Sequence, residues 1–389
     1  MFPRITRKVR IEDFNVSISI SESTSQSRTP SESTYDPAIA LNRSYNQSTT
    51  ETSVYYNFTD NAVQSTNETN VFSDILKNNQ LLLTHQIDKG SYGTCYSCFH
   101  DNREEWVAIK VIIGSIDQRT FRQNHGLDND LDILLKIDHP NMIPLIDYIV
   151  CDQYSILIFP LMTTNLTDCI IATSDWLYVN HRYKRLELFS HRVTRKKPDE
   201  NVYPSLIKWE WIEPVCRAVI NGLAYLHKNN IYHRDIKPDN ICINVARLDY
   251  CTADTKICYI DFGMSVNVTN PKFTECIGSP GYRPPEYYNV GRCIDAEYVD
   301  VWGLGCLLFV LVVGNLPPDI DSLTNGKFHQ ETGVRLMHQS LEPFLSGKIT
   351  SKWKLSRWFK LKRIIAGATQ TDPFFRLPAN ELLVMFNKI

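Results

Sequence analysis

The residues between His233 and Asn240 have the composition that phosphoryl transfer requires. This segment reads His233-Arg234-Asp235-Ile236-Lys237-Pro238-Asp239-Asn240, and the tripeptide Asp261-Phe262-Gly263 follows it along the chain. Transfer of a phosphoryl group needs a carboxylate beside the attacking hydroxyl, a cation near the transferred group, and oxygen ligands for magnesium. Asp235 could serve as the carboxylate and Lys237 as the cation. Asn240 and Asp261 could bind the magnesium ion.

Together, these two segments resemble the catalytic loop and the metal-binding loop of eukaryotic-type serine/threonine protein kinases. An isolated Asp-Phe-Gly is usually a plain turn, whereas both segments in this order are specific. The resemblance implies an α+β, bilobal protein-kinase fold with a small, mainly β N-lobe and a larger, mainly α C-lobe. It also implies ATP and Mg²⁺ as cofactors, protein substrates phosphorylated on serine or threonine, and Asp235 as the catalytic base. Lys237 at its position is the pattern of the serine/threonine class.

Length and composition fit such a protein. The chain has 389 residues, 43% of them hydrophobic, and a formal net charge of −2. This charge gives no global field that would recruit nucleic acid or an acidic membrane. The odd number of cysteines, 11, argues against a secreted disulfide framework and for an intracellular location, cytoplasmic or nuclear. No apolar run follows the N-terminal charges, so we expect no signal peptide. The apolar run Val301–Val313 is too short to span a bilayer and predicts a buried core helix, so we expect no membrane association.

The order of the segments predicts a tail followed by a single kinase domain. Residues 1–75 are rich in Ser, Thr and Asn and predict a disordered tail, either regulatory or merely solvated. The kinase domain is expected over 81–389, with the N-lobe at 81–159, the hinge at 160–162 and the C-lobe at 163–389. A polar, basic stretch over 172–208 predicts an insertion in the C-lobe.

Apolar periodicity predicts the elements of both lobes. The expected strands are Leu81–Gln86, Tyr96–Phe99, Trp106–Ile113 and Ser155–Phe159. Two further helices are expected over Asp128–Ile137 and Trp211–His227. The first of these would bury Leu131, Leu134 and Leu135 on one face and end at His139-Pro140-Asn141, because proline disfavours helix at the preceding residue.

The segment Ile87-Asp88-Lys89-Gly90-Ser91-Tyr92-Gly93-Thr94-Cys95 resembles the kinase glycine-rich loop, whose backbone N–H groups approach the phosphates. Asp88 stands where the first glycine is usual, and Cys95 where a valine usually covers the adenine. The motif Val107-Ala108-Ile109-Lys110 follows, and Lys110 matches the lysine that contacts the α- and β-phosphates. The resemblance therefore implies an ATP site that includes Gly90, Ser91, Gly93, Cys95, Ala108 and Lys110.

The segment Phe159-Pro160-Leu161-Met162 has the position of the kinase hinge between lobes. There the Pro160 carbonyl and the Met162 N–H are expected to bind the adenine edge, and Phe159 to close the back of the pocket.

Kinases pair the phosphate-binding lysine with a glutamate on the helix that follows. Counted back from His139-Pro140-Asn141, Asp130 takes that position and is expected to pair with Lys110. Asp128 and Asp132 are alternatives. Aspartate is one methylene shorter than glutamate, so the helix must approach more closely.

The stretch Gly278-Ser279-Pro280-Gly281-Tyr282-Arg283-Pro284-Pro285-Glu286 resembles the kinase segment that holds the substrate peptide. Ser279 replaces the common threonine and keeps the hydroxyl that bridges the catalytic aspartate and lysine. Glu286 is expected to form a buried ion pair with Arg376, and Asp300 to brace the backbone of the catalytic loop. These last three residues are structural rather than catalytic.

Thr274 resembles the phosphorylation position of kinases that carry an arginine before the catalytic aspartate. Phosphate added there by an upstream kinase or by autophosphorylation would bind Arg234 and order the loop. The alternative is an unmodified threonine in a constitutively ordered loop, with Glu275 supplying the charge.

Two other functions compete with catalysis. A pseudokinase that binds partners without turnover is favoured slightly by Asp88, Cys95 and Asp130. The complete set of catalytic and metal-binding residues argues against it. Nucleic-acid binding through the basic insertion rests on charge alone, so nucleic acid is not an expected partner. The irregular motifs and long tail would suit a viral or otherwise fast-diverging kinase, which in the viral case would act in the host cell.

Overall fold

The computed structural model describes residues 66–90, 93–113, 130–150, 154–181, 208–288, 294–314 and 352–389. These residues form two compact units, which we treat separately. The smaller unit takes its described residues from Met1–Ser115 and Ile146–Leu161, and the larger unit from Ile116–Leu145 and Met162–Ile389. Most of the predicted tail and insertion lies outside the described residues.

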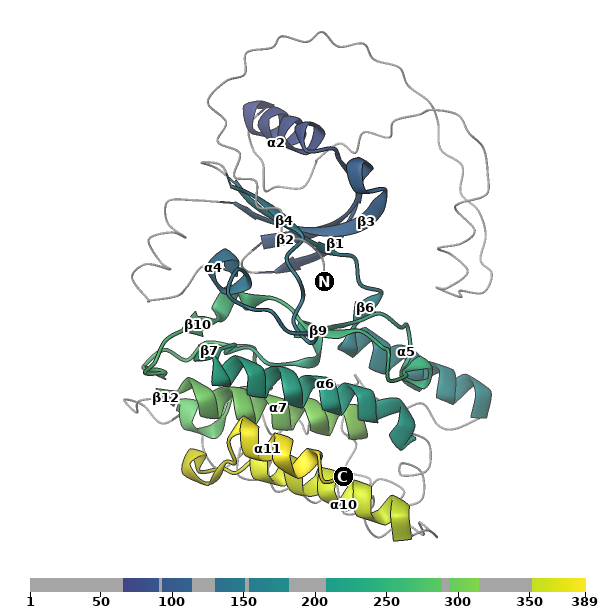
Figure 1. Cartoon of the computed structure of the whole chain (residues 1–389), viewed down its shortest axis with the longest axis vertical. Helices are drawn as coiled ribbons and strands as arrows, with labels where there is room; N and C mark the ends of the chain where they lie inside the picture. Colours follow the sequence, from purple (N-terminus) through teal and green to yellow (C-terminus); the bar gives the residue numbers. More distant parts are fainter. Residues whose placement is uncertain are drawn as a thin grey trace. The chain divides into compact units, whose positions relative to one another are not determined.

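A five-stranded antiparallel sheet forms the smaller unit (Figure 1). Its strands, in the order β1-β2-β3-β5-β4, are β1 (Leu81–Gly90), β2 (Gly93–His100), β3 (Glu105–Ile113), β5 (Tyr154–Pro160) and β4 (Asp147–Val150). The one-turn helix η1 (Asp101–Arg103) joins β2 to β3. Side chains alternate along β3, because successive residues of a strand face opposite sides. Val107, Ile109 and Val111 enter the core, while Ala108 and Lys110 face the other side. The four predicted strands are confirmed, and each is longer than predicted.

A helix also belongs to this unit, where the sequence predicted disorder. Helix α2 (Thr66–Asn78) precedes β1, so the predicted tail extends too far toward the C-terminus. Phe72, Ile75 and Leu76 pack into the hydrophobic core of the sheet, and the Phe72 ring lies 5.5 Å from the Tyr154 ring. Their spacing puts all three on one helix face. Composition alone predicted disorder here, because the other residues of this helix are mostly polar.

The larger unit is mainly helical. Its α-helices are α4 (Asp130–Leu134), α5 (Leu166–His181), α6 (Trp209–Lys228), α7 (Ala296–Val313), α10 (Lys352–Ala368) and α11 (Ala379–Phe386). Its short strands are β6 (Thr164–Asn165), β7 (Ile231–Tyr232), β8 (Ile241–Ile243), β9 (Ile257–Tyr259), β10 (Val266–Asn267), β11 (Lys272–Phe273) and β12 (Ile294–Asp295). They pair as β6-β8-β9, β10-β7 and β11-β12. Single 3₁₀ turns are η2 (Pro238–Asn240), η3 (Leu248–Tyr250), η4 (Phe262–Met264), η5 (Pro285–Tyr288) and η7 (Pro373–Phe375).

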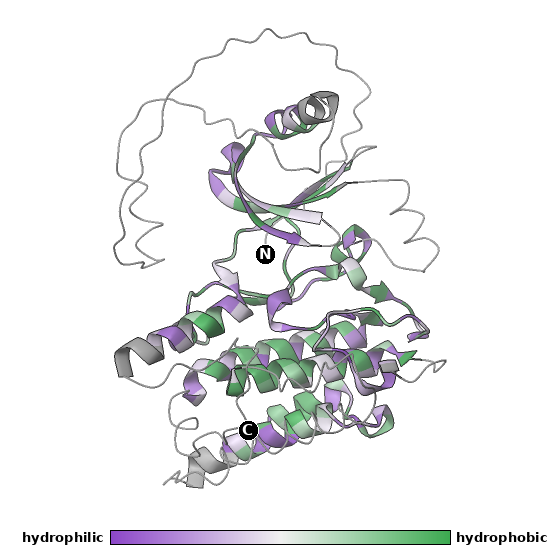
Figure 2. Ribbon diagram, turned by 180° about the vertical axis from the view of Figure 1, so that it is seen from behind, coloured by the Kyte–Doolittle hydropathy of each residue, from purple (hydrophilic) through white to green (hydrophobic). Residues whose placement is uncertain are grey.

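Helices α6 and α7 carry the core of the larger unit, and their hydrophobic residues appear green in Figure 2. The Asp295 side chain caps α7 by accepting from the Glu297 N–H at 3.0 Å, and the helix ends at Gly314 with φ of 98°. By length and composition alone α7 could cross a membrane, but 83% of its apolar window is buried inside the protein. It is therefore the expected core helix, and it begins at Ala296 rather than at Val301 as predicted.

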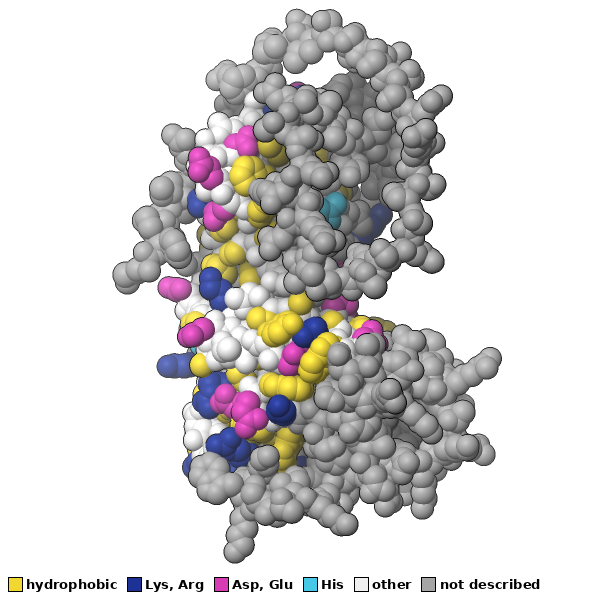
Figure 3. Space-filling model, turned by 90° about the vertical axis from the view of Figure 1, so that its right-hand side faces the viewer, with side chains coloured by type: hydrophobic (Ala, Val, Ile, Leu, Met, Phe, Trp, Pro, Cys, Tyr) yellow, Lys and Arg dark blue, Asp and Glu magenta, His cyan; other side chains and the backbone are white. Residues whose placement is uncertain are grey.

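Two predicted elements need correction. Within the described residues, α4 ends at Leu134 rather than Ile137, and it buries Asp130, Ile133 and Leu134 while Leu135 is exposed. Because the helical turn ends at Leu134, Leu135 does not share the buried side of Ile133 and Leu134. Residues 172–181 of the predicted insertion continue α5, and the buried Thr173 hydroxyl accepts from the Leu248 N–H at 2.8 Å. On the face drawn in Figure 3, the described Lys and Arg side chains lie among Asp and Glu side chains.

Candidate active site

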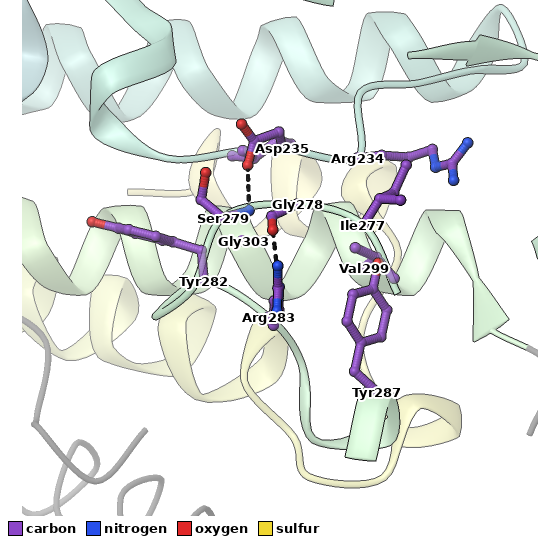
Figure 4. Close-up of a pocket in the computed structure, with 11 residues that line it drawn as sticks. Arg234, Asp235, Ile277, Gly278, Ser279, Tyr282, Arg283, Tyr287, Val299 and Gly303 are labelled. Carbon is purple, nitrogen blue, oxygen red and sulfur yellow. Dashed lines mark hydrogen bonds between the residues drawn. The ribbon is translucent and has the colours of Figure 1, made fainter. Parts of the chain in front are cut away.

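Three donors converge on the Asp235 carboxylate, in the loop between β7 and η2. The Ser279 backbone N–H donates to Oδ1 at 2.8 Å, as Figure 4 shows. Asn240 Nδ2 donates to Oδ2 at 3.0 Å, and Lys237 Nζ lies 3.2 Å from the same oxygen. Asp235 is only 7% exposed, and these contacts hold its carboxylate in one orientation.

Ser279 links the catalytic loop to the segment predicted to hold substrate. Lys237 Nζ donates to the Ser279 hydroxyl at 2.5 Å. The expected bridge is thus divided between two groups. The hydroxyl contacts Lys237, whereas the backbone N–H contacts Asp235. A serine in place of threonine keeps both contacts.

Asp300, in α7, holds the backbone of the catalytic loop. Its carboxylate accepts the His233 N–H at 2.7 Å and the Arg234 N–H at 2.6 Å, and His227 Nε2 lies 3.1 Å away. Arg234 has φ of 67°, a conformation that is strained for a residue with a side chain. The two charge-assisted bonds to the buried Asp300 carboxylate stabilise this conformation next to Asp235.

Asn240 and Asp261 offer oxygen atoms suited to magnesium. Asn240 uses Nδ2 to donate to the Asp235 carbonyl at 2.8 Å, which leaves its Oδ1 for a cation. Asp261 lies between β9 and η4 in a left-handed conformation, with φ of 59°. The described residues contain no group of three or more His, Cys, Asp or Glu side chains that could hold a metal. One carboxylate and one amide fit Mg²⁺, which takes few protein ligands and completes its shell with phosphates and water.

In the smaller unit, the predicted nucleotide contacts share one face of the sheet. Cys95 of β2 is opposite Lys110 of β3, and Ala108 is opposite Phe159 of β5. Directly opposite residues on antiparallel strands face the same side. Cys95 and Cys98 have a C-x-x-C spacing. They face opposite sides of β2, and burial raises the pKa of the Cys98 thiol to about 12, so they form no dithiol site.

Gly93, the first residue of β2, has no room for a side chain. Gly90 and Gly93 are paired across the two strands, and a Cβ on Gly93 would lie 2.7 Å from the Val111 carbonyl oxygen. Ser91 lies outside the described residues. Asp88 accepts the Lys89 N–H at 2.7 Å through its own side chain.

Lys110 and Asp130 are buried in their respective units, with exposures of 8% and 1%. The alternative partner Asp132 is exposed, and Asp128 lies outside the described residues. The pairing of Lys110 with Asp130 stays a prediction. Pro160 ends β5 opposite Val107, and the division between the two units falls between Leu161 and Met162.

The substrate segment is fixed from several sides, and some of the residues responsible were missed in the sequence. Arg283 Nε donates to the Gly278 carbonyl at 2.9 Å (Figure 4). Gly278 has φ of 107°, and a Cβ there would lie 2.9 Å from the Arg234 carbonyl oxygen. Tyr282 and Tyr287 line the same pocket, where burial raises the pKa of both phenols. These contacts of Arg283, Tyr282 and Tyr287 could not be predicted, because a single arginine or tyrosine forms no local sequence pattern.

The predicted ion pair behind this segment is present. Arg376 donates through Nη1 and Nη2 to the two oxygens of Glu286, each at 2.6 Å, and both side chains are buried. Thr274 lies ahead of the segment with its side chain exposed.

Comparison with known proteins agrees with this geometry. Residues 82–385 match the model of the protein kinase domain. Serine/threonine-protein kinase chk-2 of Caenorhabditis elegans is 28% identical over 66% of this chain and 48% of its own length. The carbon catabolite-derepressing protein kinase of Saccharomyces cerevisiae is 25% identical over 77% of this chain and 40% of its own. Cyclin-dependent kinase-like 2 of Rattus norvegicus is 25% identical over 61% of this chain and 40% of its own.

The chain spans less than half the length of these curated relatives. They come from a nematode, a yeast and a rat, and they give no support to the viral origin considered above. Because the matched residues cover both units and include every motif of the catalytic loop, the chain belongs to the protein kinase domain family.

Proposed function

We propose that this chain is an ATP-dependent protein kinase that phosphorylates serine and threonine hydroxyls of protein substrates. The observation that carries the proposal is the arrangement around Asp235. The Lys237 ammonium lies 3.2 Å from the Asp235 carboxylate and donates to the Ser279 hydroxyl, and the loop that carries Asp235 and Lys237 is braced by Asp300. A fold retained only for binding partners would have no need of this arrangement.

Each group has a role that its contacts permit. Asp235 accepts the proton of the substrate hydroxyl, because its carboxylate is fixed and lines a pocket. Lys237 neutralises negative charge on the transferred group, and its bond to Ser279 ties that charge to the substrate segment. Asn240 and Asp261 provide the oxygen ligands for Mg²⁺. ATP, when bound with Mg²⁺, supplies the phosphoryl group. Lys110 is assigned to the α- and β-phosphates by family resemblance.

Specificity for serine and threonine is supported by Lys237, which follows the pattern of that class. The printed names of relatives point the same way, since one is a serine/threonine-protein kinase.

The test is transfer of radiolabelled phosphate from ATP, with Mg²⁺, to a degenerate peptide library, followed by phosphoamino-acid analysis. We expect label on serine and threonine, with turnover of about 1–100 s⁻¹ for the active form. Asp235→Asn and Asp261→Asn should abolish transfer without lowering the melting temperature. Asp254→Asn, an exposed aspartate in a turn, is the matched control and should keep full activity.

Two outcomes would contradict the proposal. Full activity in Asp235→Asn would remove the assigned role of the carboxylate. No transfer by the wild-type chain under any condition, with ATP still bound, would make it a pseudokinase.

A further inference from the structure

Arg234 contacts an aromatic ring of the activation segment, by which we mean the chain between Asp261-Phe262-Gly263 and Glu286. Its guanidinium carbon lies 4.2 Å from the centre of the Phe273 ring, and Arg234 is only 4% exposed. In Figure 4 its side chain points away from the Asp235 carboxylate. A cation is attracted to the negative face of an aromatic ring at this distance, and the attraction is stronger where the pair is buried.

Phe273 is itself held in place by the fold. It belongs to β11, where it is opposite Ile294 of β12, and it packs against the apolar cluster of Tyr232, Val266 and Ala296. The Ala296 N–H also donates to the Pro271 carbonyl at 2.8 Å. The Phe273 ring therefore packs against an apolar cluster of the larger unit and also contacts the Arg234 guanidinium.

Arg234 contacts the same segment at a second point. Its carbonyl oxygen lies against Gly278, at a distance that no side chain there could tolerate. Gly278 directly precedes Ser279, whose N–H and hydroxyl contact Asp235 and Lys237. The chain from Phe273 to Ser279 is thus fastened to the catalytic loop at both ends.

We propose that Phe273 is a positioning residue that orders the activation segment by clasping Arg234, without a phosphate on the loop. This inference rests on the proposed function and names how its site is regulated. The residue next to it, Thr274, is exposed, whereas Arg234 is buried. A phosphate on Thr274 would start at the surface, whereas the guanidinium is buried and already in contact with the Phe273 ring. The geometry therefore favours a constitutively ordered loop over a phosphorylation switch.

The experiment uses the full chain treated with phosphatase, with loss of all phosphate verified by intact mass. Phe273→Leu removes the ring and keeps an apolar side chain, while Phe273→Tyr keeps the ring. Thr274→Ala changes the exposed neighbour and is the matched control. Steady-state kinetics give kcat and KM for peptide and for ATP. Hydrogen exchange of residues 271–288 reports order in the segment without depending on activity.

We expect dephosphorylated wild type, Thr274→Ala and Phe273→Tyr to have similar activity. Phe273→Leu should lose about 5- to 30-fold in kcat/KM for peptide, the range that corresponds to a partly to fully desolvated cation–π contact. Its KM for ATP should not change, because the ligand groups of Asn240 and Asp261 do not touch the ring. Its amides over 271–288 should exchange faster. If Phe273→Leu does not fold, Phe273→Met makes the same comparison.

Two results would overturn the inference. One is wild-type protein that is inactive without phosphate and gains activity when Thr274 is phosphorylated. The other is Phe273→Leu with unchanged peptide kinetics and unchanged exchange. If no form transfers phosphate, the proposed function fails, and exchange alone decides about the clasp. Faster exchange in Phe273→Leu but not in Phe273→Tyr would still support it.

Discussion

Glu286→Gln should destabilise the larger unit without a matching loss of catalysis. The Glu286 carboxylate receives two parallel bonds of 2.6 Å from Arg376, and neither side chain is more than 4% exposed. Arg376 also donates to the carbonyls of Tyr298 at 3.0 Å and Gln370 at 2.9 Å. Its guanidinium lies 4.9 Å from the Trp302 ring. The substitution therefore removes the charge partner and leaves these other contacts in place.

The size of the effect follows from these contacts. Removing one partner of a buried ion pair costs about 3–5 kcal/mol. Because Arg376 keeps two carbonyl acceptors and the aromatic face, we expect the lower end, about 3 kcal/mol. In a domain of this size each kcal/mol lowers the melting temperature by about 2–4 °C, so the expected decrease is about 6–12 °C.

The assay is urea unfolding followed by tryptophan fluorescence, with kinase activity measured well below the transition. Glu213→Gln is the matched control, because it breaks an ion pair with Arg217 on the surface of α6, where the side chains are 27% and 49% exposed. Exposed pairs of this kind contribute about 0–1 kcal/mol. Buried and exposed carboxylates are thus compared through the same chemical change.

Equal urea midpoints for Glu286→Gln and wild type would refute the reasoning, as would an equal loss in Glu213→Gln. A large decrease in kcat with no change in stability would show that Glu286 acts in catalysis rather than in the fold.

Three further substitutions test the remaining contacts. Asp300→Asn turns an amide N–H₂ toward the backbone donors of the catalytic loop and loses at least one charge-assisted bond of about 1.5–3 kcal/mol, so kcat should decrease about tenfold or more; unchanged kinetics would refute the bracing role. Gly278→Ala places a Cβ 2.9 Å from the Arg234 carbonyl oxygen, and should lower kcat/KM for peptide while leaving KM for ATP as it is. Phe72→Ala removes the ring that packs on Tyr154 and should cost about 3 kcal/mol in urea unfolding. An unchanged midpoint would place α2 outside the core.

Local patterns in the sequence predicted the elements that depend on near neighbours. The run Trp106–Ile113 identified β3, and the apolar run Val301–Val313 identified α7. The same reasoning failed for α2. Its few apolar residues lie among many polar ones, and they are buried only because the helix packs against the sheet. It also failed for Leu135, which continues a helical pattern beyond the point where α4 ends.

The residue types that carry the chemistry were determined by the sequence alone, because a carboxylate, a lysine and two oxygen ligands in this order have a specific use. Which groups they contact was decided only by the tertiary structure. Ser279 reaches Asp235 from 44 positions away, and Asp300 holds Arg234 from 66 positions away. No local pattern predicts such contacts, because they form only when α7 and the activation segment both pack against the catalytic loop. For the same reason, packing placed Phe273 rather than Thr274 against Arg234.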